Sequence, residues 1–340
     1  MKNTVVTFGE IMLRLSPMGH QRFSHATSLE VVYGGGESNV AVSLAQFGLP
    51  VEHVTRLPAQ DLGDCVLTEL RRWGVGTQHV LRGGERVGIY FYEKGAGHRN
   101  GKVVYDRAHS SMATILPGMV DWAAVFFGAN WFHWTGITPA ISQSAADACQ
   151  EAIEVANKLG LTVSFDLSYR KNLWQYGRSP AEILPPMVAG CDLILCSMED
   201  AAAHFGIFPK GKKDNETAAI ESVCEQLMAR FPKAKKIVMT RRSGSDFSAQ
   251  GLGAVLFDGK KLLESPVYQI AQIVDRVGSG DALMAGLIYG LLTFADDQRA
   301  LDFGAAAACL KHSIPGDLNL VTVAEVEALV AGQGGGRVSR

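Results

Sequence analysis

The chain has 340 residues, of which 47% are apolar and 19% charged, and its formal net charge is −2. This balance is that of a globular protein with enough apolar material for a sizeable core, and the length suits one or two domains. Because binding phosphate backbones takes clustered Lys and Arg, the near-neutral charge excludes nucleic acid and acidic membrane surfaces as partners.

Neither a membrane span nor a targeting signal is evident. No apolar run approaches the roughly 20 residues that a span requires, and the chain enters an apolar strand within its first residues. The six cysteines form no CxxC pair, and no two histidines stand at zinc-binding spacing. We therefore expect a cytoplasmic protein with reduced cysteines.

The first third of the chain is rich in expected strands. Apolar and polar residues partly alternate there, which predicts a sheet with one face in water. The expected strands are Val5–Gly9, Ile11–Leu15, Leu29–Tyr33, Val87–Glu93 and Lys102–Arg107. A helical stretch over Val40–Phe47 ends at Gly48.

From about residue 120 short apolar strands alternate with helices. This alternation predicts a mostly parallel sheet covered by helices on both faces. The expected strands are Trp131–Trp134, Thr162–Asp166, Leu193–Cys196, Ile237–Thr240 and Gln269–Val274, with a hairpin of Ala254–Phe257 and Lys261–Glu264. The expected helices are Gln143–Leu159, Ala218–Arg230, Asp281–Leu292, Gln298–His312 and Val323–Val330.

These elements predict one α/β domain over residues 1–340 that carries a smaller sheet. The strands of the smaller sheet come from within about residues 11–33 and 86–108, and the α/β core from the remainder. Ligands of α/β sheets bind at the carboxyl ends of the strands, so a small sheet there would act as a lid. We also expect this sheet to pair two or more copies of the chain into a homodimer or higher homo-oligomer. Residues 331–340 are expected to be a flexible tail.

One segment, residues 275–286, combines small residues with a carboxylate at the start of an apolar helix. Gly278, Ser279 and Gly280 precede the first helical turn, where backbone N–H groups and the helix dipole favour an anion. Asp281 stands at the edge of the same site, where a carboxylate can accept the proton of an attacking hydroxyl. The pattern therefore predicts phosphoryl transfer, with Gly278–Gly280 as an anion hole and Asp281 as general base.

This segment has one structural alternative, and two other phosphate-binding motifs do not match it. The turn can be purely structural, with Asp281 as the N-cap of the helix. The Gly-x-x-x-x-Gly-Lys-Ser/Thr pattern of P-loop proteins is absent. A dinucleotide-binding Gly-x-Gly-x-x-Gly pattern that starts at Gly278 fails at Leu283.

Two signatures resemble those of the ribokinase-like (PfkB) carbohydrate kinases. Gly278–Asp281 is similar to the end of the family's C-terminal signature, in which Gly-Ala/Gly-Gly-Asp opens a helix. Gly34, Gly35 and Gly36, followed by Asn39, resemble its N-terminal signature. The two stand in the family's order and cover nearly the whole chain. The resemblance implies a three-layer α/β/α core, a mostly parallel sheet, a small β-sheet lid, and a kinase that uses ATP and Mg²⁺.

Three further segments, Val104–Ala108, Phe165–Lys171 and Lys311–Asp317, resemble the 2-keto-3-deoxygluconate kinases. This resemblance implies phosphorylation of that sugar acid on its 6-hydroxyl. Independently, Arg107 and Arg170 each offer a planar fork that matches a carboxylate, which a neutral sugar would not need. The residues expected to bind substrate are Gly34, Gly35, Gly36, Asn39, Tyr90, Tyr105, Arg107, Arg170 and Asp317.

The family resemblance also implies where the nucleotide and the metal bind. The residues expected at the nucleotide are Ser168, Ser197, Thr240, Arg242 and Gly244, with adenine near the helix at Ala305–Ala308. Glu199 and Asp200 are the candidates to hold Mg²⁺ through water. The chain departs from the family at Arg276, where Thr is usual, and at Ser168 and Ser197, where Asn is common. The departure at Ser197, in the motif whose acidic residue helps to hold magnesium, leaves the metal assignment open.

Each candidate also has a structural interpretation. Arg107 and Arg170 are alternatively ion-pair partners, Tyr90 ordinary strand packing, and the glycine run a simple turn. Asp166 is either the buried partner of an arginine or a ligand contact, and His133 is expected to be a core histidine. For the whole chain, the alternatives are another PfkB sugar kinase (fructokinase, tagatose or ribokinase type) or a non-catalytic sugar- or nucleotide-binding regulator.

Overall fold

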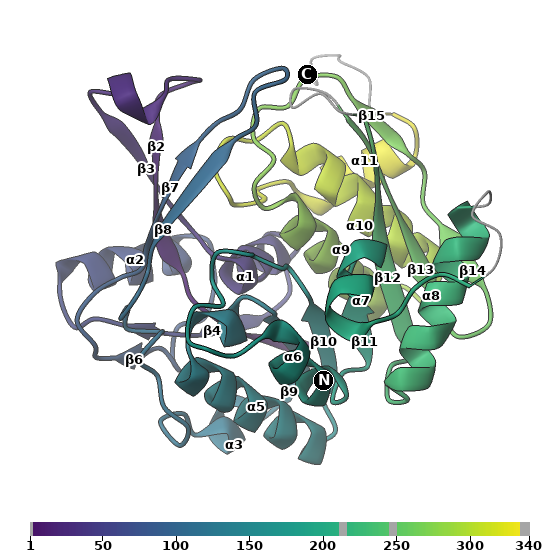
Figure 1. Ribbon diagram of the computed structural model, residues 1–340, viewed down its shortest axis with the longest axis horizontal. Helices are drawn as coiled ribbons and strands as arrows, with labels where there is room; N and C mark the ends of the chain where they lie inside the picture. Colours follow the sequence, from purple (N-terminus) through teal and green to yellow (C-terminus); the bar gives the residue numbers. More distant parts are fainter. Residues whose placement is uncertain (1–2, 211–215, 245–249, 334–340) are drawn as a thin grey trace.

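Two large elements of architecture, a nine-stranded sheet and a four-stranded sheet, organise the part of the chain that the structure describes (Figure 1). The computed structural model describes residues 3–210, 216–244 and 250–333. The large sheet has the order β14-β13-β12-β11-β10-β9-β1-β4, and β15 pairs with β13. Its strands are β1 (Thr4–Phe8), β4 (Val51–Val54), β9 (Ala129–Thr135), β10 (Thr162–Asp166), β11 (Leu193–Leu195), β12 (Lys236–Ser243), β13 (Gln250–Phe257), β14 (Leu262–Glu264) and β15 (Tyr268–Ile270).

The strands from β4 to β12 pair in parallel, whereas β13, β14 and β15 form an antiparallel edge. Both faces of this sheet are buried, because successive residues of one strand enter different cores. On β9, Phe132 and Trp134 join one apolar cluster and Trp131 joins the other. Such strands read as nearly continuous apolar runs, which is how they were recognised in the sequence.

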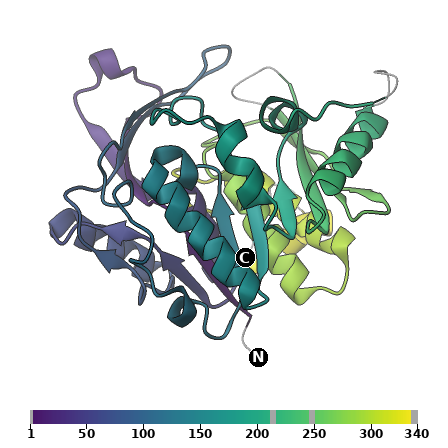
Figure 2. The ribbon, with the colours of Figure 1, turned by 60° about the horizontal axis from the view of Figure 1, so that its bottom comes forward.

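Helices cover both faces and complete three layers, as Figure 2 shows for the teal helices that lie across the strands. One face packs against α3 (Trp122–Val125), α5 (Gln143–Lys158), α6 (Pro180–Val188), α7 (Met198–Phe205) and α8 (Glu216–Arg230). The other packs against α1 (Gly36–Gln46), α2 (Asp61–Arg72), α9 (Ser279–Thr293), α10 (Asp297–Lys311) and α11 (Val323–Val330). Among the described residues, no helix combines the length and the apolarity needed to cross a membrane.

The small sheet has the order β3-β2-β7-β8 and comes from the two segments expected to supply it. Its strands are β3 (Leu29–Gly34), β2 (Met12–Pro17), β7 (Ile89–Glu93) and β8 (Lys102–Asp106). Met12, Tyr90 and Tyr92 form a small apolar cluster on the inner face.

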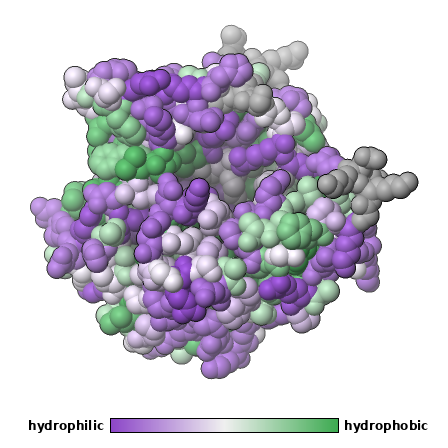
Figure 3. Space-filling model, in the orientation of Figure 1, coloured by the Kyte–Doolittle hydropathy of each residue, from purple (hydrophilic) through white to green (hydrophobic). Residues whose placement is uncertain are grey.

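The outer face of the small sheet is more apolar than the sequence predicted. Leu29, Val31 and Val104 are exposed, and Figure 3 shows a hydrophobic band in this part of the surface. The predicted sheet face in water is therefore present, and apolar side chains form part of it. The expectation of a homo-oligomer through this sheet stays a prediction, which the exposed apolar residues favour.

The predicted architecture, a mostly parallel sheet between helices with a separate small sheet, is confirmed. The largest boundary errors are at two element starts and two element ends. The helix predicted over Val40–Phe47 begins at Gly36, and the strand predicted over Ala254–Phe257 begins at Gln250. The strand predicted over Ile237–Thr240 extends to Ser243, and the strand predicted over Gln269–Val274 ends at Ile270. Helices α2, α3, α6 and α7 and the short α4 (Thr138–Ile141) were not predicted; α6 contains Pro185 and Pro186, which read as helix breakers. Most of the expected tail, residues 334–340, lies outside the described residues.

Helices α9 and α10 pack closely because small residues face each other. A Cβ atom built at Gly290 would lie 2.5 Å from Ala300 Cα and 2.7 Å from Ala300 Cβ. At Gly286, it would lie 2.8 Å from Gly304 Cα. These contacts leave no room for a methyl group, so the two backbones set the position of α9.

We expect Gly290→Ala to lower the free energy of unfolding by about 1–3 kcal/mol, because the added methyl group overpacks the contact between α9 and α10. Urea denaturation measures this change. Alanine favours a helix over glycine by about 1 kcal/mol where no neighbour interferes. A variant as stable as the wild type, or more stable, would therefore contradict the packing described.

Candidate active site

A cavity of about 420 Å³ lies between the small sheet and the carboxyl ends of the parallel strands. This volume suits a small-molecule ligand, and the location is the usual one for α/β sheets. The predicted residues that line it are Gly35, Gly36, Asn39, Tyr90, Tyr105, Arg107, Ser168, Arg170, Ser197, Asp200, Thr240, Arg242, Gly278, Ser279, Gly280, Asp281 and Asp317. The lining does not include Gly34, Glu199 or Gly244.

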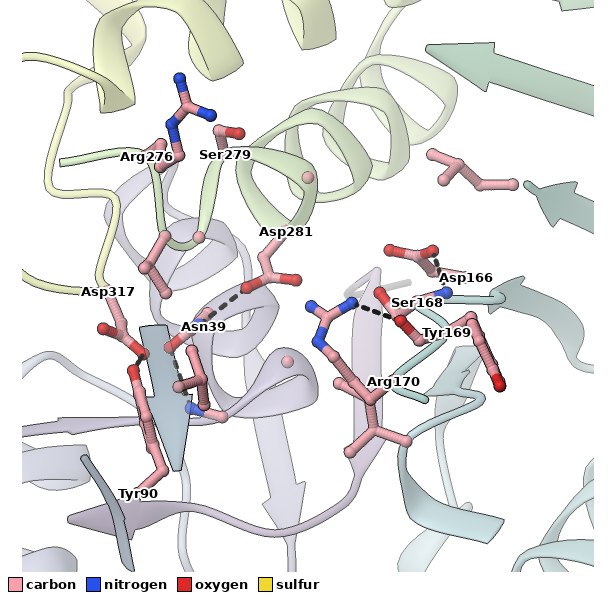
Figure 4. A pocket seen from close by; sticks show the side chains of 18 of the residues that line it. Asn39, Tyr90, Asp166, Ser168, Tyr169, Arg170, Arg276, Ser279, Asp281 and Asp317 are labelled. Atoms are coloured by element: carbon pink, nitrogen blue, oxygen red, sulfur yellow. Dashed lines mark hydrogen bonds between the residues drawn. The ribbon is translucent and has the colours of Figure 1, made fainter. Parts of the chain in front are cut away.

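Asp281 lies in the first turn of α9 and points into this cavity (Figure 4). Its Oδ2 accepts a hydrogen bond from Asn39 Nδ2 at 2.7 Å. Asn39 is held in turn, since its Oδ1 accepts a hydrogen bond from the Gly35 N–H at 3.2 Å. The N-cap of α9 is Gly278, so the interpretation of Asp281 as a helix N-cap is wrong.

Burial controls the protonation of Asp281. Removal from water raises the pKa of its carboxyl to about 7, although the hydrogen bond from Asn39 favours the charged form. The charge of Asp166 raises the pKa further, and that of Arg170 opposes the rise. A carboxyl that titrates near neutral pH is well matched to removing a proton from a hydroxyl.

The start of α9 is shaped by glycine. Gly278 has a φ of 83°, in the left-handed region, and a Cβ there would collide with the backbone carbonyl of Asp317. A Cβ at Gly280 would meet no atom within 4 Å, so this residue faces open space. The Ser279 N–H donates a hydrogen bond to Arg276 O at 3.3 Å, which makes Gly280 the more open backbone position of the predicted anion hole.

Besides Arg107, three arginines, Arg170, Arg242 and Arg276, line the same cavity. Arg242 Nη2 donates a hydrogen bond to Ser279 Oγ at 3.3 Å. Burial lowers the pKa of Arg242, and the charges of Arg276 and Arg170 lower it further. Because like charges repel unless an anion lies between them, three guanidinium groups beside a helix N-terminus favour a polyanionic ligand.

The two arginines predicted to bind an acidic group differ in their surroundings. Arg107 is buried, its Nε donates to Glu10 Oε2 at 2.7 Å, and its Nη2 pairs with the same carboxylate. The interpretation of Arg107 as an ion-pair partner is therefore confirmed. Arg170 is exposed, and its Nη1 donates to Tyr169 O at 3.0 Å. Figure 4 shows its guanidinium directed toward Asp281.

Tyr90 and Asp317 are tied to a buried arginine, Arg14, that sequence reasoning did not single out. Arg14 Nη1 donates to Asp317 Oδ1 at 2.7 Å, and Nη2 donates to Asp275 Oδ2 at 2.6 Å. The Tyr90 hydroxyl donates to Asp317 Oδ2. A charged residue within the apolar run Ile11–Leu15 was the only sequence signal for this cluster. The Asp317 side chain fits beside Gly34 because that residue has no Cβ, which would overlap the Asp317 side chain.

Two carboxylates stand at the ends of neighbouring strands. Asp166 is buried at the end of β10, its Oδ1 accepts a hydrogen bond from the Ser168 N–H at 3.0 Å, and burial raises its pKa to about 6. Ser168 has a φ of 41°, an uncommon conformation for a residue other than glycine. Asp200 belongs to the capping box of α7, in which its carboxylate accepts a hydrogen bond from the Ser197 N–H at 3.2 Å.

These carboxylates fit Mg²⁺ better than they fit a tightly caged metal. In residues 3–210, 216–244 and 250–333, no three His, Cys, Asp or Glu side chains gather as ligands. Mg²⁺ needs no such group, because it keeps several waters and uses one or two carboxylates together with substrate phosphates. Asp166 and Asp200 both line the cavity, whereas Glu199 is exposed and lies outside it.

The remaining predicted residues lie on or after β12, apart from the histidine His133. Thr240 and Arg242 lie on β12, and Gly244 follows that strand in a left-handed conformation with a φ of 94°. His133 is buried, and its Nδ1 lies 2.9 Å from Ser164 Oγ, which confirms it as a core histidine.

Comparisons with known proteins agree with this architecture. The model of the pfkB family of carbohydrate kinases matches residues 2–321. The solved structure of 2-dehydro-3-deoxygluconokinase from Thermotoga maritima has 41% sequence identity and a TM-score of 0.91, over 97% of this chain and 99% of that one. A 2-dehydro-3-deoxygalactonokinase from Haloferax volcanii is 34% identical over 96% of each chain. A 2-dehydro-3-deoxygluconokinase from Bacillus subtilis is 25% identical over 94% of this chain and 92% of its own.

The family match spans nearly the whole described chain, and one cavity brings together a helix N-terminus and a carboxylate from one signature with Asn39 from the other. The chain therefore belongs to the pfkB family of carbohydrate kinases.

Proposed function

We propose that the protein transfers the terminal phosphoryl group of ATP to the 6-hydroxyl of 2-keto-3-deoxygluconate. The observation that carries the proposal is the partly buried Asp281 carboxyl, with a pKa of about 7, beside a helix N-terminus and the arginines Arg170, Arg242 and Arg276. The names of the similar kinases from Thermotoga maritima, Haloferax volcanii and Bacillus subtilis support a 2-keto-3-deoxy sugar acid as substrate.

In the proposed reaction Asp281 accepts the proton of the substrate's 6-hydroxyl. At the same time the oxygen of that hydroxyl bonds to the γ-phosphorus. The bond from the γ-phosphorus to the β–γ bridging oxygen breaks, and ADP leaves with that electron pair. The α9 N-terminus, Gly278–Gly280, holds the transferring group, and Arg242 and Arg276 offset its charge. When bound, Mg²⁺ neutralises the nucleotide phosphates, and Asp166 and Asp200 are the residues that would hold it.

The opposite end of the substrate carries a carboxylate, for which Arg170 is the main candidate. Its guanidinium is exposed to the cavity, whereas Arg107 already pairs with Glu10. Tyr105 lines the cavity from the small sheet and offers a hydroxyl to the sugar. Gly35 and Gly36 line the cavity as well, so their backbone can approach the substrate closely. The proposed nucleotide contacts are Ser168, Ser197, which caps α7 after β11, and Thr240, which lies within β12.

A panel of sugars with ATP tests the substrate class. We expect kcat/KM for 2-keto-3-deoxygluconate or its galactonate isomer to exceed that for fructose or ribose by at least about 30-fold, since a charge-assisted contact contributes about 2 kcal/mol or more. Coupled measurement of ADP release gives these constants. A preference for a neutral sugar would contradict the proposal of a sugar-acid substrate. The protein would then be a sugar kinase of another specificity.

The variant Arg170→Ala belongs to the same panel. It should reduce the preference for the acids over fructose, because only the acids carry the carboxylate. Arg178→Ala is the matched control: Arg178 follows in the same loop region, is half exposed, and pairs with Glu182 on the surface at 3.5 Å. An unchanged preference in Arg170→Ala would remove this arginine from substrate recognition.

Asp281→Asn tests the general base. We expect kcat to fall by at least about 100-fold while sugar binding, measured by calorimetry, is retained, because general-base contributions start near that size. Asp302→Asn is a control, since Asp302 is a half-buried aspartate of α10 whose pKa burial also raises. Equal rates in Asp281→Asn and the wild type would contradict the role of Asp281.

The pH dependence of kcat/KM tests the protonation of Asp281. Only the ionised carboxylate accepts a proton, so kcat/KM should rise with pH as the pH passes through the pKa of about 7. Asn39 donates to the charged form and lowers that pKa. Asn39→Ala should therefore move the rising limb to higher pH. A limb that stays in place, or that lies near the ordinary aspartate value of 3.8, would contradict this assignment.

A further inference from the structure

Lys311, the last residue of α10, is fully buried, with a relative exposure of 0%. Lysine is almost never fully buried unless its charge is matched. Its Nζ donates a hydrogen bond to Ile314 O at 3.0 Å and lies 3.5 Å from Asp275 O. Both recorded acceptors are backbone carbonyls, and they belong to the two loops on either side of the α9 N-terminus.

The lysine side chain also lies directly behind the start of α9. A Cβ built at Gly278 would lie 3.3 Å from Lys311 Cε. The backbone N–H groups of Val274 and Asp275 donate to His312 O at 2.9 Å and 3.3 Å, which joins the same loop to the end of α10. The position of Gly278 is therefore fixed from behind by the Lys311 stem and its two carbonyl contacts.

The charge of Lys311 completes a buried group of four ions. Arg14 pairs with both Asp275 and Asp317, and all four side chains are buried. With Lys311 the group has two positive and two negative charges. Lys94 Nζ lies 3.8 Å from Asp275 Oδ2 and adds a further positive charge, with a side chain that is 13% exposed. Without Lys311, the fully buried positive charge behind the helix N-terminus that has to accept a phosphoryl group would be halved.

We propose that Lys311 is a positioning residue: an ammonium that holds the loop before α9 against the segment 314–317 and adds a buried positive charge behind the anion hole. The inference rests on the proposed phosphoryl transfer. The lysine does not touch the substrate; it acts through the backbone of Gly278 and its neighbours. The fold supplies it permanently, at the C-terminal end of α10, where the helix dipole also favours a cation.

Lys311→Met tests the inference, because methionine keeps an unbranched apolar stem and removes the charge. We expect kcat to fall by about 10-fold or more, below the effect of removing a direct oxyanion donor. The KM for the sugar acid should change by less than about 3-fold, since Lys311 lies outside the cavity lining. Lys236→Met is the control, because Lys236 pairs with Asp297 at the opposite end of α10.

Chemical rescue separates the charge from ordinary stability. In Lys311→Ala, n-propylammonium should restore part of the lost kcat, and n-propanol at the same concentration should not. The proposal would be overturned if Lys311→Met kept the kcat of the wild type. It would also be overturned if the loss of kcat in Lys311→Met matched the loss of folded protein and n-propylammonium restored no activity to Lys311→Ala. Turnover by the wild type in these assays keeps this outcome distinct from a failure of the proposed function.

If neither variant folds, the pH dependence of kcat in the wild-type enzyme tests the proposal. Burial lowers the pKa of Lys311 to about 8, and its ammonium loses its proton above that value. The charged groups that act on it are Arg14, Asp275, Asp281 and Asp317, with Lys94 at the rim, Arg242, Arg276 and His312 nearby. We expect kcat to decline as pH rises through this range. A constant kcat from about pH 7.5 to 9.5 would overturn the proposal, since a general base alone leaves a plateau there.

Discussion

The whole site depends on a carboxylate that is partly withdrawn from water at the start of a helix. Burial disfavours the charged form of Asp281 and raises its pKa to about 7, while the Asn39 hydrogen bond keeps the ionised form accessible. A more exposed carboxylate would be a weaker base, and one without a donor would remain protonated at neutral pH. The protein balances these two tendencies by joining α1 to α9, two helices far apart in the sequence and in contact within one core.

The small sheet is linked to this carboxylate through buried charge. Arg14 comes from β2 of the small sheet, whereas Asp275 and Asp317 flank the start of α9. Removing one partner of such a buried pair typically destabilises a protein by about 3–5 kcal/mol, because the remaining charge has no compensation. The pairing thus holds the inner face of the small sheet, with Tyr90, over the cavity. Any motion of the small sheet would have to leave the ion pairs of Arg14 with Asp275 and Asp317 intact.

Local patterns in the sequence predicted the parts of the site that are local. The small residues before Asp281, the glycine run before Asn39 and the alternation of strands and helices each lie within short segments, and the structure places them around one cavity. Partners distant in sequence were not predictable in this way. Arg14 and Asp317 are 303 residues apart, and the Glu10 partner of Arg107 is 97 residues away, so no spacing rule connects them. Lys311 begins a segment that resembles the sugar-acid kinases, but its helix also contains Arg299, and no pattern in the sequence distinguished Lys311 as buried.

The most direct test of this account is an infrared titration of the protein with ¹³C-labelled aspartate carboxyls. Difference spectra between acid and neutral pH should contain a carboxyl that ionises near pH 7 and that disappears in Asp281→Asn. Most other aspartates ionise well below this range, which leaves few signals to separate. If no such carboxyl exists, and Asp281 ionises near the ordinary value of 3.8, the burial that underlies the proposed base is absent.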